Sequence, residues 1–507
     1  MMKRKPNILF ITADQQRADC FGFQGRAVKT PHLDQMARDG TVFSACITPN
    51  VVCQPSRASI LTGILPMTHG VHDNGIDLDP KIGENGFAGL LSNAGYHAGL
   101  VGKAHFSTFH TFEPTGTPEC VRSSSEYGDD WYGPYMGFDH VELTVIGHAW
   151  WLPEKPPAGL HYERWYYADG HGDLKNRLLH AGYPGDIAVQ TWESQLPPVW
   201  HNSTWIADRS IEYVRSHKDE PWCLWVSFPD PHHPFDAPSP WSRMHSPEEV
   251  DLPEHRTRDL DRRPWWHRAA VEAPIKGKFS DVRSNYSRIP PQPDDCLRKI
   301  IANTYGMISL IDHNVGRIFG SLESLGLSEN TIVIYSGDHG DWLGDHGLIL
   351  KGPMFYEGLL RVPMIVRGPG VPAGHMVGDP VSSLDIPASI MDWAGVEQPV
   401  EWHSRSLRPL LDNGMESRDF AYSEWELLAQ RVGIQLSLQC VRTKSHKLTY
   451  EAMSQDGELY DLVADPFEMD NLWNDPVAAA VQRELLDMIA ARPDDRISEL
   501  ATPVGAA

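Results

Sequence analysis

Residues 53–57, Cys-Gln-Pro-Ser-Arg, combine a thiol, a turn former, a hydroxyl and a fixed positive charge near the start of the chain. The apolar stretch that follows predicts a helix with Ser56 as its N-cap, so that Cys53 lies just before a turn set by Pro55. Backbone N–H groups at such a helix start attract anions, and Arg57 can hold an oxyanion in a bidentate grip. A lone cysteine is usually a buried structural residue, so these five residues alone leave both interpretations open.

The longer segment CQPSRASILTG, from Cys53 to Gly63, resembles the C-x-P-S-R-x-x-x-L-T-G signature of type I sulfatases. The resemblance implies that a formylglycine-generating enzyme, a partner during maturation, oxidises Cys53 to Cα-formylglycine. It also implies that the hydrated aldehyde, and not a thiolate, is the nucleophile.

Two acidic motifs stand directly after runs that predict buried strands. Asp14-Gln15 follows the strand expected over Asn7–Ala13, and Asp338-His339 follows the strand expected over Thr331–Tyr335. Ligands of open parallel sheets bind beyond the carboxyl ends of the strands, so both motifs can reach one site. Carboxylate oxygens and a neutral imidazole suit a divalent cation, although an aspartate at a strand end is as often a turn residue or a helix cap.

The sulfatase resemblance assigns Asp14, Asp338 and His339 as ligands of one divalent metal ion, with the formylglycine oxygen at Cys53 completing the coordination sphere. Many sulfatases carry a second aspartate at the position of Gln15 and an asparagine at that of His339. Choline-sulfatase-like and phosphonate-monoester-hydrolase-like members share the version found here. Calcium (Ca²⁺) is the usual metal of the family, and the nitrogen ligand makes manganese (Mn²⁺) a competitor. The role of Gln15 is left open.

Three further segments resemble sulfatase elements, and each follows a predicted strand or its loop. Lys103 and His105 lie in LVGKAH, which resembles the G-K-x-H element. His232 lies in PHHPF, which resembles P-H-x-P-F. Lys351, in GLILKGPMFYEG, resembles the lysine that follows the second G-x-H-G.

A sulfate ester is an anion that repels nucleophiles, so its non-bridging oxygens have to be neutralised. The resemblance gives this role to the metal, Arg57 and Lys103. One hydroxyl of the formylglycine hydrate would attack sulfur, deprotonated with help from Asp338 and the metal.

Departure of the leaving group and release of sulfate require further proton transfers. His232 and Lys351 are the candidates that protonate or stabilise the leaving oxygen. His105 is the expected base for the second hydroxyl, whose deprotonation expels sulfate and restores the aldehyde. His233 and His346 are interpreted as structural residues.

Strand-like runs alternate with helical patterns, which predicts an α/β fold with a mostly parallel central sheet flanked by helices on both faces. The resemblance implies an alkaline-phosphatase-like fold. Besides the two strands above, strands are expected over His97–Val101, Trp222–Phe228 and Val362–Val366. Helices are expected over His32–Asp39, Phe87–Ala94, Trp205–Ser216, Cys296–Leu325 and Ile386–Ala394.

The character of the chain changes near residue 410, which predicts a catalytic α/β domain over residues 1–410 and a C-terminal subdomain over residues 411–507. Antiparallel strands are expected over Cys440–Tyr450 and Glu458–Asp461, with a terminal helix near Val481–Ala490. This part resembles the small C-terminal sheet of sulfatases.

The 507 residues carry a net charge of −23, which argues against nucleic acid or an anionic membrane as partner. The seven cysteines are scattered and odd in number, so we expect neither a disulfide framework nor a zinc site. No stretch reaches the length of a membrane span, and the basic start leads into a short strand instead of a signal peptide. These features predict a reduced, cytoplasmic protein.

The sequence therefore predicts a sulfuric ester hydrolase that releases sulfate and an alcohol or phenol. One rival uses the same nucleophile as a phosphonate monoester hydrolase or phosphodiesterase, although such enzymes carry uncharged residues around the positions of Lys103 and His105. A second rival is a binding protein whose Cys53 is never converted.

The natural sulfate ester and the oligomeric state are not predicted. Five aromatic residues in the stretch 150–167 would form either a substrate wall or ordinary packing: Trp150, Trp151, Trp165, Tyr166 and Tyr167.

Overall fold

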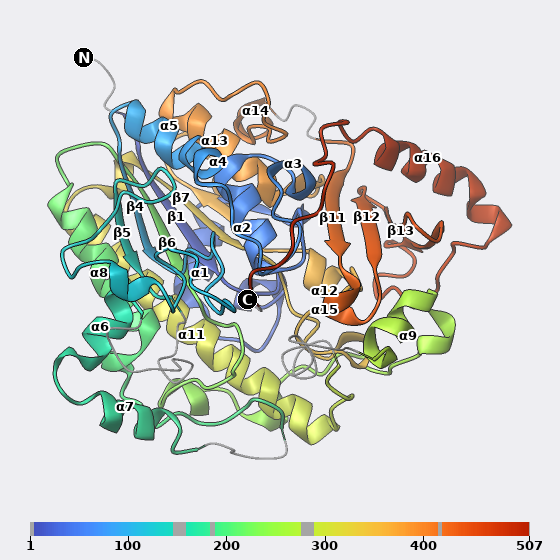
Figure 1. The fold of residues 1–507 in the computed structure, drawn as a ribbon, viewed down its shortest axis with the longest axis horizontal. Helices are drawn as coiled ribbons and strands as arrows, with labels where there is room; N and C mark the ends of the chain where they lie inside the picture. The colour runs from blue at the N-terminus through green and yellow to red at the C-terminus, as the bar shows by residue number, and fades with distance from the viewer. Residues whose placement is uncertain (1–4, 146–158, 183–187, 275–287, 414–417, 506–507) are drawn as a thin grey trace.

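An eight-stranded sheet forms the centre of the larger part of the protein in the computed structural model (Figure 1). The structure describes residues 5–145, 159–182, 188–274, 288–413 and 418–505. The strand order is β5-β4-β6-β1-β7-β8-β2-β9, and within these described strands only β8 runs against its neighbours. The predicted mostly parallel sheet is thereby confirmed. Its strands are β1 (Asn7–Ala13), β2 (Thr41–Phe43), β4 (His97–Gly102), β5 (His140–Leu143), β6 (Trp222–Phe228), β7 (Thr331–Gly337), β8 (Met364–Arg367) and β9 (His375–Val377).

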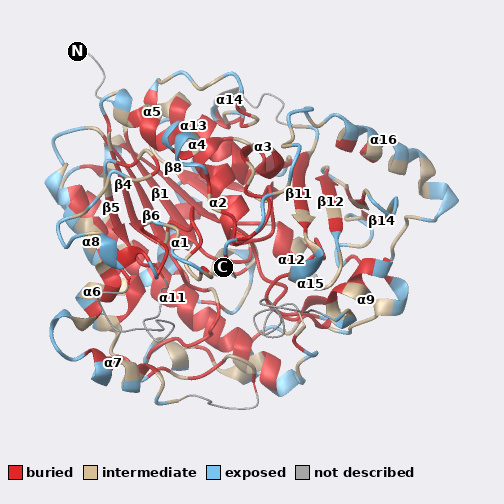
Figure 2. Cartoon of the chain, in the orientation of Figure 1, coloured by how far each residue is buried: buried red, intermediate tan, exposed pale blue. Residues whose placement is uncertain are grey.

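Helices cover both faces of this sheet, which buries its central strands completely (Figure 2). Alternate side chains of β1 point to opposite faces, so Ile8 and Phe10 join one core while Leu9 and Ile11 join the other. The first core is covered by α2 (Cys53–Thr62), α5 (Phe87–Asn93) and α13 (Ile386–Ala394). The second is covered by α1 (Pro31–Arg38), α8 (Asn202–Ser216) and α11 (Asp294–Ser324). The five predicted helices thus occur within a few residues of their expected bounds.

The start of α2 differs from the prediction. The helix begins at Cys53, and its N-cap is Val52 in an extended conformation (φ −131°, ψ 157°), so Ser56 is not the cap. The Ser56 hydroxyl instead donates to the carbonyl of Asp338 at 2.7 Å. The Ser56 side chain, which the local sequence pattern assigns to capping, is therefore used in a tertiary hydrogen bond. The helix ends at Thr62, and its C-cap is Gly63, whose positive φ of 70° and close approach to Trp402 both favour glycine.

A separate four-stranded antiparallel sheet follows in the order β11-β12-β13-β14. Its elements are β11 (Ala421–Leu427), β12 (Leu436–Arg442), β13 (His446–Glu451) and β14 (Asp456–Asp461), with α16 (Ala479–Ala490) packed on it. The single strand predicted over Cys440–Tyr450 is wrong, because a turn divides that range. The hydroxyl of Thr443 accepts the backbone N–H of His446 at 3.0 Å and closes the turn. The domain boundary at residue 410 stays a prediction.

After α16 the chain returns to the larger part of the protein (Figure 1). The backbone N–H of Ile497 donates to the carbonyl of Met67 at 2.7 Å. Farther on, Val504 donates to Gly75 at 2.8 Å and accepts from Phe112 at 2.9 Å. This C-terminal tail, residues 497–504, therefore joins α3 (Pro66–His69) and the loop after it to the loop that follows β4.

Two expectations from composition concern the whole chain. All seven cysteines are buried in thiol form. Among the residues that the structure describes, no helix is both long and apolar enough to cross a membrane.

Trp225 on β6 lies at the centre of the first core, with its ring 4.9 Å from that of Phe10 and 5.7 Å from that of Phe106. We expect Trp225→Ala to lower the free energy of unfolding by about 3–5 kcal/mol, because it leaves a large cavity. Urea unfolding measures this loss. The control is Trp265→Ala, at a site that is 42% exposed. Equal losses in the two variants would contradict this account of the core.

Candidate active site

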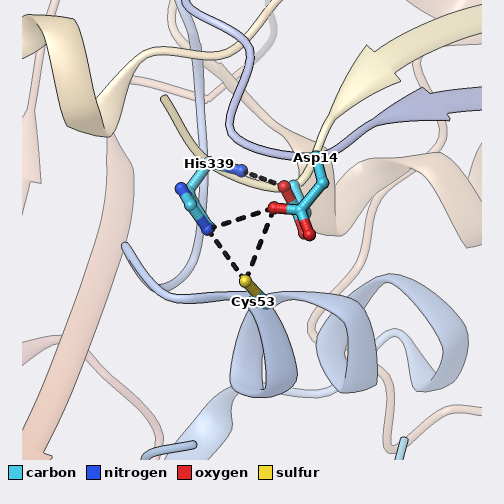
Figure 3. Close-up of side chains that lie close together, drawn as sticks. Asp14, Cys53 and His339 are labelled. Carbon is cyan, nitrogen blue, oxygen red and sulfur yellow. Dashed lines mark hydrogen bonds and ion pairs between the residues drawn. The ribbon is translucent and has the colours of Figure 1, made fainter. Parts of the chain in front are cut away.

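Two aspartates and a cysteine converge at the carboxyl edge of the main sheet. Figure 3 shows one of the aspartates, Asp14, with Cys53 and His339. Asp14 follows β1 and Asp338 follows β7, and these strands are parallel neighbours with Ala13 paired to Gly337. Cys53 begins α2, and its Sγ lies 3.5 Å from Oδ1 of Asp14. The two acidic motifs therefore lie at one site, as their positions after strands predict.

His339 completes a buried group of four side chains whose potential ligand atoms all lie within 4.8 Å of one another: Asp14, Cys53, Asp338 and His339. Its Nδ1 lies 2.8 Å from the carbonyl oxygen of Gly340. Because a carbonyl can only accept, Nδ1 carries the proton of the neutral ring and Nε2 keeps its lone pair. That Nε2 faces Sγ of Cys53 at 3.1 Å and Oδ1 of Asp14 at 3.5 Å. Burial, with the nearby Lys351, lowers the pKa of His339 and favours the neutral ring.

The donor set of this group fits a divalent cation. Two carboxylates and a correctly oriented imidazole nitrogen offer the oxygen and nitrogen ligands that such ions bind. The hydrogen bond from His339 to Gly340 is the type of outer contact that fixes a metal-binding histidine. Asp14, Asp338 and His339 could therefore hold a metal beside residue 53.

Both carboxylates are paired with cations, of which Arg57 is fully buried and Lys103 partly buried. Oδ1 of Asp338 accepts the backbone N–H groups of Gln15 at 3.0 Å and His339 at 2.9 Å, and Oδ2 lies 3.4 Å from Arg57. Asp14 forms an ion pair with Lys103. Burial alone would raise the pKa of Asp14, but Lys103 and the surrounding cationic groups hold it well below its usual range.

Arg57 is fully buried, and most of its donors already have protein partners. Nε donates to the carbonyl of Ala104 at 2.7 Å. Nη2 donates to the carbonyl of Lys103 and to the hydroxyl of Ser227, while Nη1 faces Asp338. The sequence predicts that Arg57 binds an oxyanion through two N–H groups. In this structure Nε and Nη2 already donate to protein groups, so that bidentate contact is not available. The guanidinium instead joins the loop after β4 to Asp338.

Lys103 and His105 lie on the loop that follows β4. Burial would lower the pKa of Lys103, but Asp14 outweighs it and raises that pKa. His105 is buried, has a positive φ of 55°, and neither ring nitrogen has a hydrogen-bond partner among the described residues. Burial and the neighbouring Lys103 hold the pKa of His105 well below its usual range, so its ring is neutral.

Lys351 contacts Cys53 directly, with its Nζ 3.0 Å from Sγ. The same Nζ is 3.1 Å from Nε2 of His232 and 3.1 Å from Nε2 of His339. Nδ1 of His232 lies 2.7 Å from the carbonyl of His233, so the proton of the neutral ring is on Nδ1. Burial, reinforced by His233 and Lys351, holds the pKa of His232 well below its usual range.

The sequence profile of the sulfatase family matches residues 6–396. The chain belongs to the sulfatase family. A second profile, that of the C-terminal part of N-sulphoglucosamine sulphohydrolase, matches residues 344–494.

Individual members of the family are distant. The multifunctional alkaline phosphatase superfamily protein PehA of Trinickia caryophylli is 28% identical, over 95% of this chain and 94% of that protein. The arylsulfatase of Clostridium perfringens is 29% identical, over 93% of this chain and 90% of its own. The crystal structure of the phosphonate monoester hydrolase of Agrobacterium radiobacter has a TM-score of 0.77 and 27% identity, and the similarity covers 98% of both chains. The alkaline-phosphatase-like fold expected from the sequence is thereby confirmed.

Sequence reasoning missed several residues that hold this candidate site together. The side chain of Gln15, whose role was left open, donates to Asp341 at 2.6 Å. Asp341 also accepts the backbone N–H of Leu350 at 2.8 Å, directly before Lys351. The sequence signal that could have identified Asp341 is its position three residues after Asp338. Gln15 also lies 3.5 Å from Nδ1 of His233, so that histidine borders the site.

His346 and the described aromatic residues of the stretch 150–167 lie outside the group around Cys53. His346 stacks on Tyr356 with ring centroids 3.7 Å apart, in keeping with a structural role. Trp150 and Trp151 lie outside the described residues. Tyr166 is buried in the second core, as the packing interpretation expects. Trp165 and Tyr167 are on the same helix, α6 (His161–Ala168).

We expect Asp338→Ala to bind a divalent metal more weakly, because it loses a carboxylate and leaves the charge of Arg57 unpaired. The loss of affinity should be at least the roughly 10–100-fold that removal of an outer-shell partner costs. Metal content after purification without chelator measures it and also distinguishes calcium from manganese. The control is Asp295→Ala, at an exposed position of α11. Stoichiometric, tightly held metal in Asp338→Ala would refute the ligand assignment.

Proposed function

We propose that this sulfatase-family protein hydrolyses sulfate monoesters with a formylglycine made from Cys53 and a divalent metal. The observation that carries the proposal is the position of Cys53 at the start of α2, within 3.5 Å of Asp14, His339 and Lys351. Burial and the charge of Asp14, opposed by the two lysines, raise the pKa of the Cys53 thiol to about 11. An unmodified Cys53 would therefore be a poor nucleophile near neutral pH. This supports a different nucleophile at residue 53.

The modified residue would supply the nucleophile, and the metal would supply positive charge at the site. A hydrated formylglycine offers one hydroxyl for attack on sulfur and a second whose deprotonation expels sulfate and restores the aldehyde. A cation held by Asp14, Asp338 and His339 would bind the anionic substrate and lower the pKa of the attacking hydroxyl. The maturation partner would be a formylglycine-generating enzyme.

Lys103, which pairs with Asp14, and Lys351, which contacts Cys53 and His339, would bind the non-bridging oxygens. They would supply local positive charge in a protein of net charge −23. Arg57 would act mainly by orienting two other residues, Asp338 and Lys103, because it contacts the carboxylate of the first and the carbonyl of the second.

Proton transfer to the leaving oxygen is assigned to Lys351 and His232 together. Since Nδ1 of the neutral His232 is directed at a carbonyl, its Nε2 can accept from Lys351 and hold that ammonium in place. Lys351 would then donate the proton. His105 is assigned to the second half of the reaction, because a neutral ring whose nitrogens have no hydrogen-bond partner among the residues that the structure describes can take a proton from the second hydroxyl.

Hydrolysis of phosphonate monoesters or phosphodiesters by the same nucleophile is the second candidate function. It is favoured by the similarity to a phosphonate monoester hydrolase over 98% of both chains. A sulfate monoester presents three non-bridging oxygens, whereas these substrates present two. The positive charge of Lys103, which can bind the third oxygen, is the reason for preferring a sulfatase.

We expect Cys53→Ala to reduce turnover of an aryl sulfate to the background rate while thermal stability is kept. Cys53→Ser should be nearly as damaging, because a serine could accept sulfate but could not shed it by reforming a carbonyl. The control is Cys223→Ser, another buried cysteine that lies on β6 and outside the group. Mass spectrometry of the wild-type peptide should show CHO in place of CH2–SH at residue 53. Steady turnover by either Cys53 variant would exclude the mechanism.

We expect Lys103→Ala to cost about 2–4 kcal/mol in kcat/KM for an aryl sulfate, by analogy with loss of one oxyanion donor. The same change should cost less for the matched aryl phenylphosphonate, which lacks one oxygen. Paired kinetics of wild type and variant on both substrates measure the difference, with metal content checked because Lys103 contacts Asp14. The control is the exposed Lys81→Ala. Equal losses would show that Lys103 does not bind the third oxygen, and a wild-type preference for the phosphonate would favour the second function.

A further inference from the structure

A single buried carboxylate holds the loop that carries His105. The two oxygens of Glu119 accept three successive backbone N–H groups: that of His105, that of Phe106 at 2.9 Å and that of Ser107 at 3.0 Å. The hydroxyl of Tyr135 donates to the same carboxylate at 2.8 Å. Glu119 is only 3% exposed, so these contacts replace its hydration.

Three consecutive N–H groups that point to one place form a nest, a concave site of positive potential for an anion. The nest exists because His105 adopts a φ of 55°, a left-handed conformation that a non-glycine residue holds only when its surroundings enforce it. Here the anion is internal, namely Glu119. Neutralising it would leave a nest without an anion and a strained residue without support.

The opposite side of the same loop is held by Arg57. The carbonyls of Lys103 and Ala104 accept from the guanidinium, just before the nest begins. His105 is therefore fixed between a cation that binds the preceding carbonyls and an anion that binds its own and the following amides. The nitrogens of its ring, which have no hydrogen-bond partner in the described part of the chain, remain available for proton transfer.

We propose that Glu119 is a positioning residue for the reaction at Cys53, which acts by fixing the backbone and hence the ring of His105. This inference rests on the proposed function, in which His105 serves the release of sulfate. Glu119 does not touch the group around Cys53, since its oxygens are occupied by the nest and Tyr135. Its effect on the reaction therefore has to pass through the loop.

The test is Glu119→Gln, which keeps the shape but directs an amide NH2 at a backbone N–H. We expect kcat for 4-nitrophenyl sulfate to fall about 10–100-fold, the usual cost of losing an outer-shell partner. The first turnover should survive: rapid mixing should show a burst of 4-nitrophenol equal to the formylglycine content, followed by slow steady release. A general loss of structure would not spare the burst while slowing the later step.

Two comparisons separate positioning from packing. In a His105→Ala background, Glu119→Gln should change kcat less than about twofold, because the residue that it positions is gone. The matched control is Asp77→Asn, since Asp77 accepts a single N–H of the same loop, that of Thr108 at 2.7 Å. This control should keep the wild-type kcat. Additive losses in the double variant, or loss of the burst in Glu119→Gln, would overturn the inference.

Failure of the proposed function has a different signature. If wild type turns over no sulfate ester, that function fails, and the crystal structure of Glu119→Gln then tests the inference through the conformation of residue 105. We expect its φ to leave the left-handed region, and an unchanged φ would overturn the inference. If Glu119→Gln does not fold, Glu119→Asp, which keeps the charge with a shorter reach, is carried through the same double-variant comparison with the same expected non-additivity.

Discussion

Two ion pairs, Asp14 with Lys103 and Asp338 with Arg57, are the interactions on which the rest of the site depends, and both carboxylates are fully buried. Charges at this depth are costly unless each has a partner and satisfied hydrogen bonds. Each pair also joins distant segments, because the carboxylates follow β1 and β7 while the cations come from the loop after β4 and from α2. The charges are therefore neutralised only when these segments come together at the edge of the sheet.

The loops that complete the site are supported from outside it. Asp341 holds the backbone before Lys351, and the C-terminal sheet holds the segment after it. Lys447 of β13 donates to the carbonyl of Phe355, and Glu468 accepts the N–H of Glu357 at 2.8 Å. The small antiparallel sheet thus contributes to the active edge, although among the described residues the side chains that contact Cys53 come from other parts of the chain. Loops fixed at both ends in this way can hold charged groups without the motion that exposed loops allow.

The main elements and the convergence of the motifs could be predicted from the sequence, because apolar runs mark buried strands and ligands gather at their carboxyl ends. The contacts that depend on tertiary neighbours could not. Ser56 reads as a helix cap, yet Asp338 takes its hydroxyl. Arg57 reads as an anion grip, yet nearby carbonyls occupy its donors. Glu119 carries no signal at all, since its partners are amides that converge only once His105 has a positive φ.

The burial of Cys53 limits when its side chain can be reached. The residue is 1% exposed, and its Sγ contacts His339 and Lys351. Both of these residues follow β7, which begins 278 residues after Cys53. During synthesis the segment that carries Cys53 therefore leaves the ribosome long before the parts that enclose it. Any enzyme that modifies this thiol has to act within that interval, so the order of the elements along the chain sets a time limit on maturation.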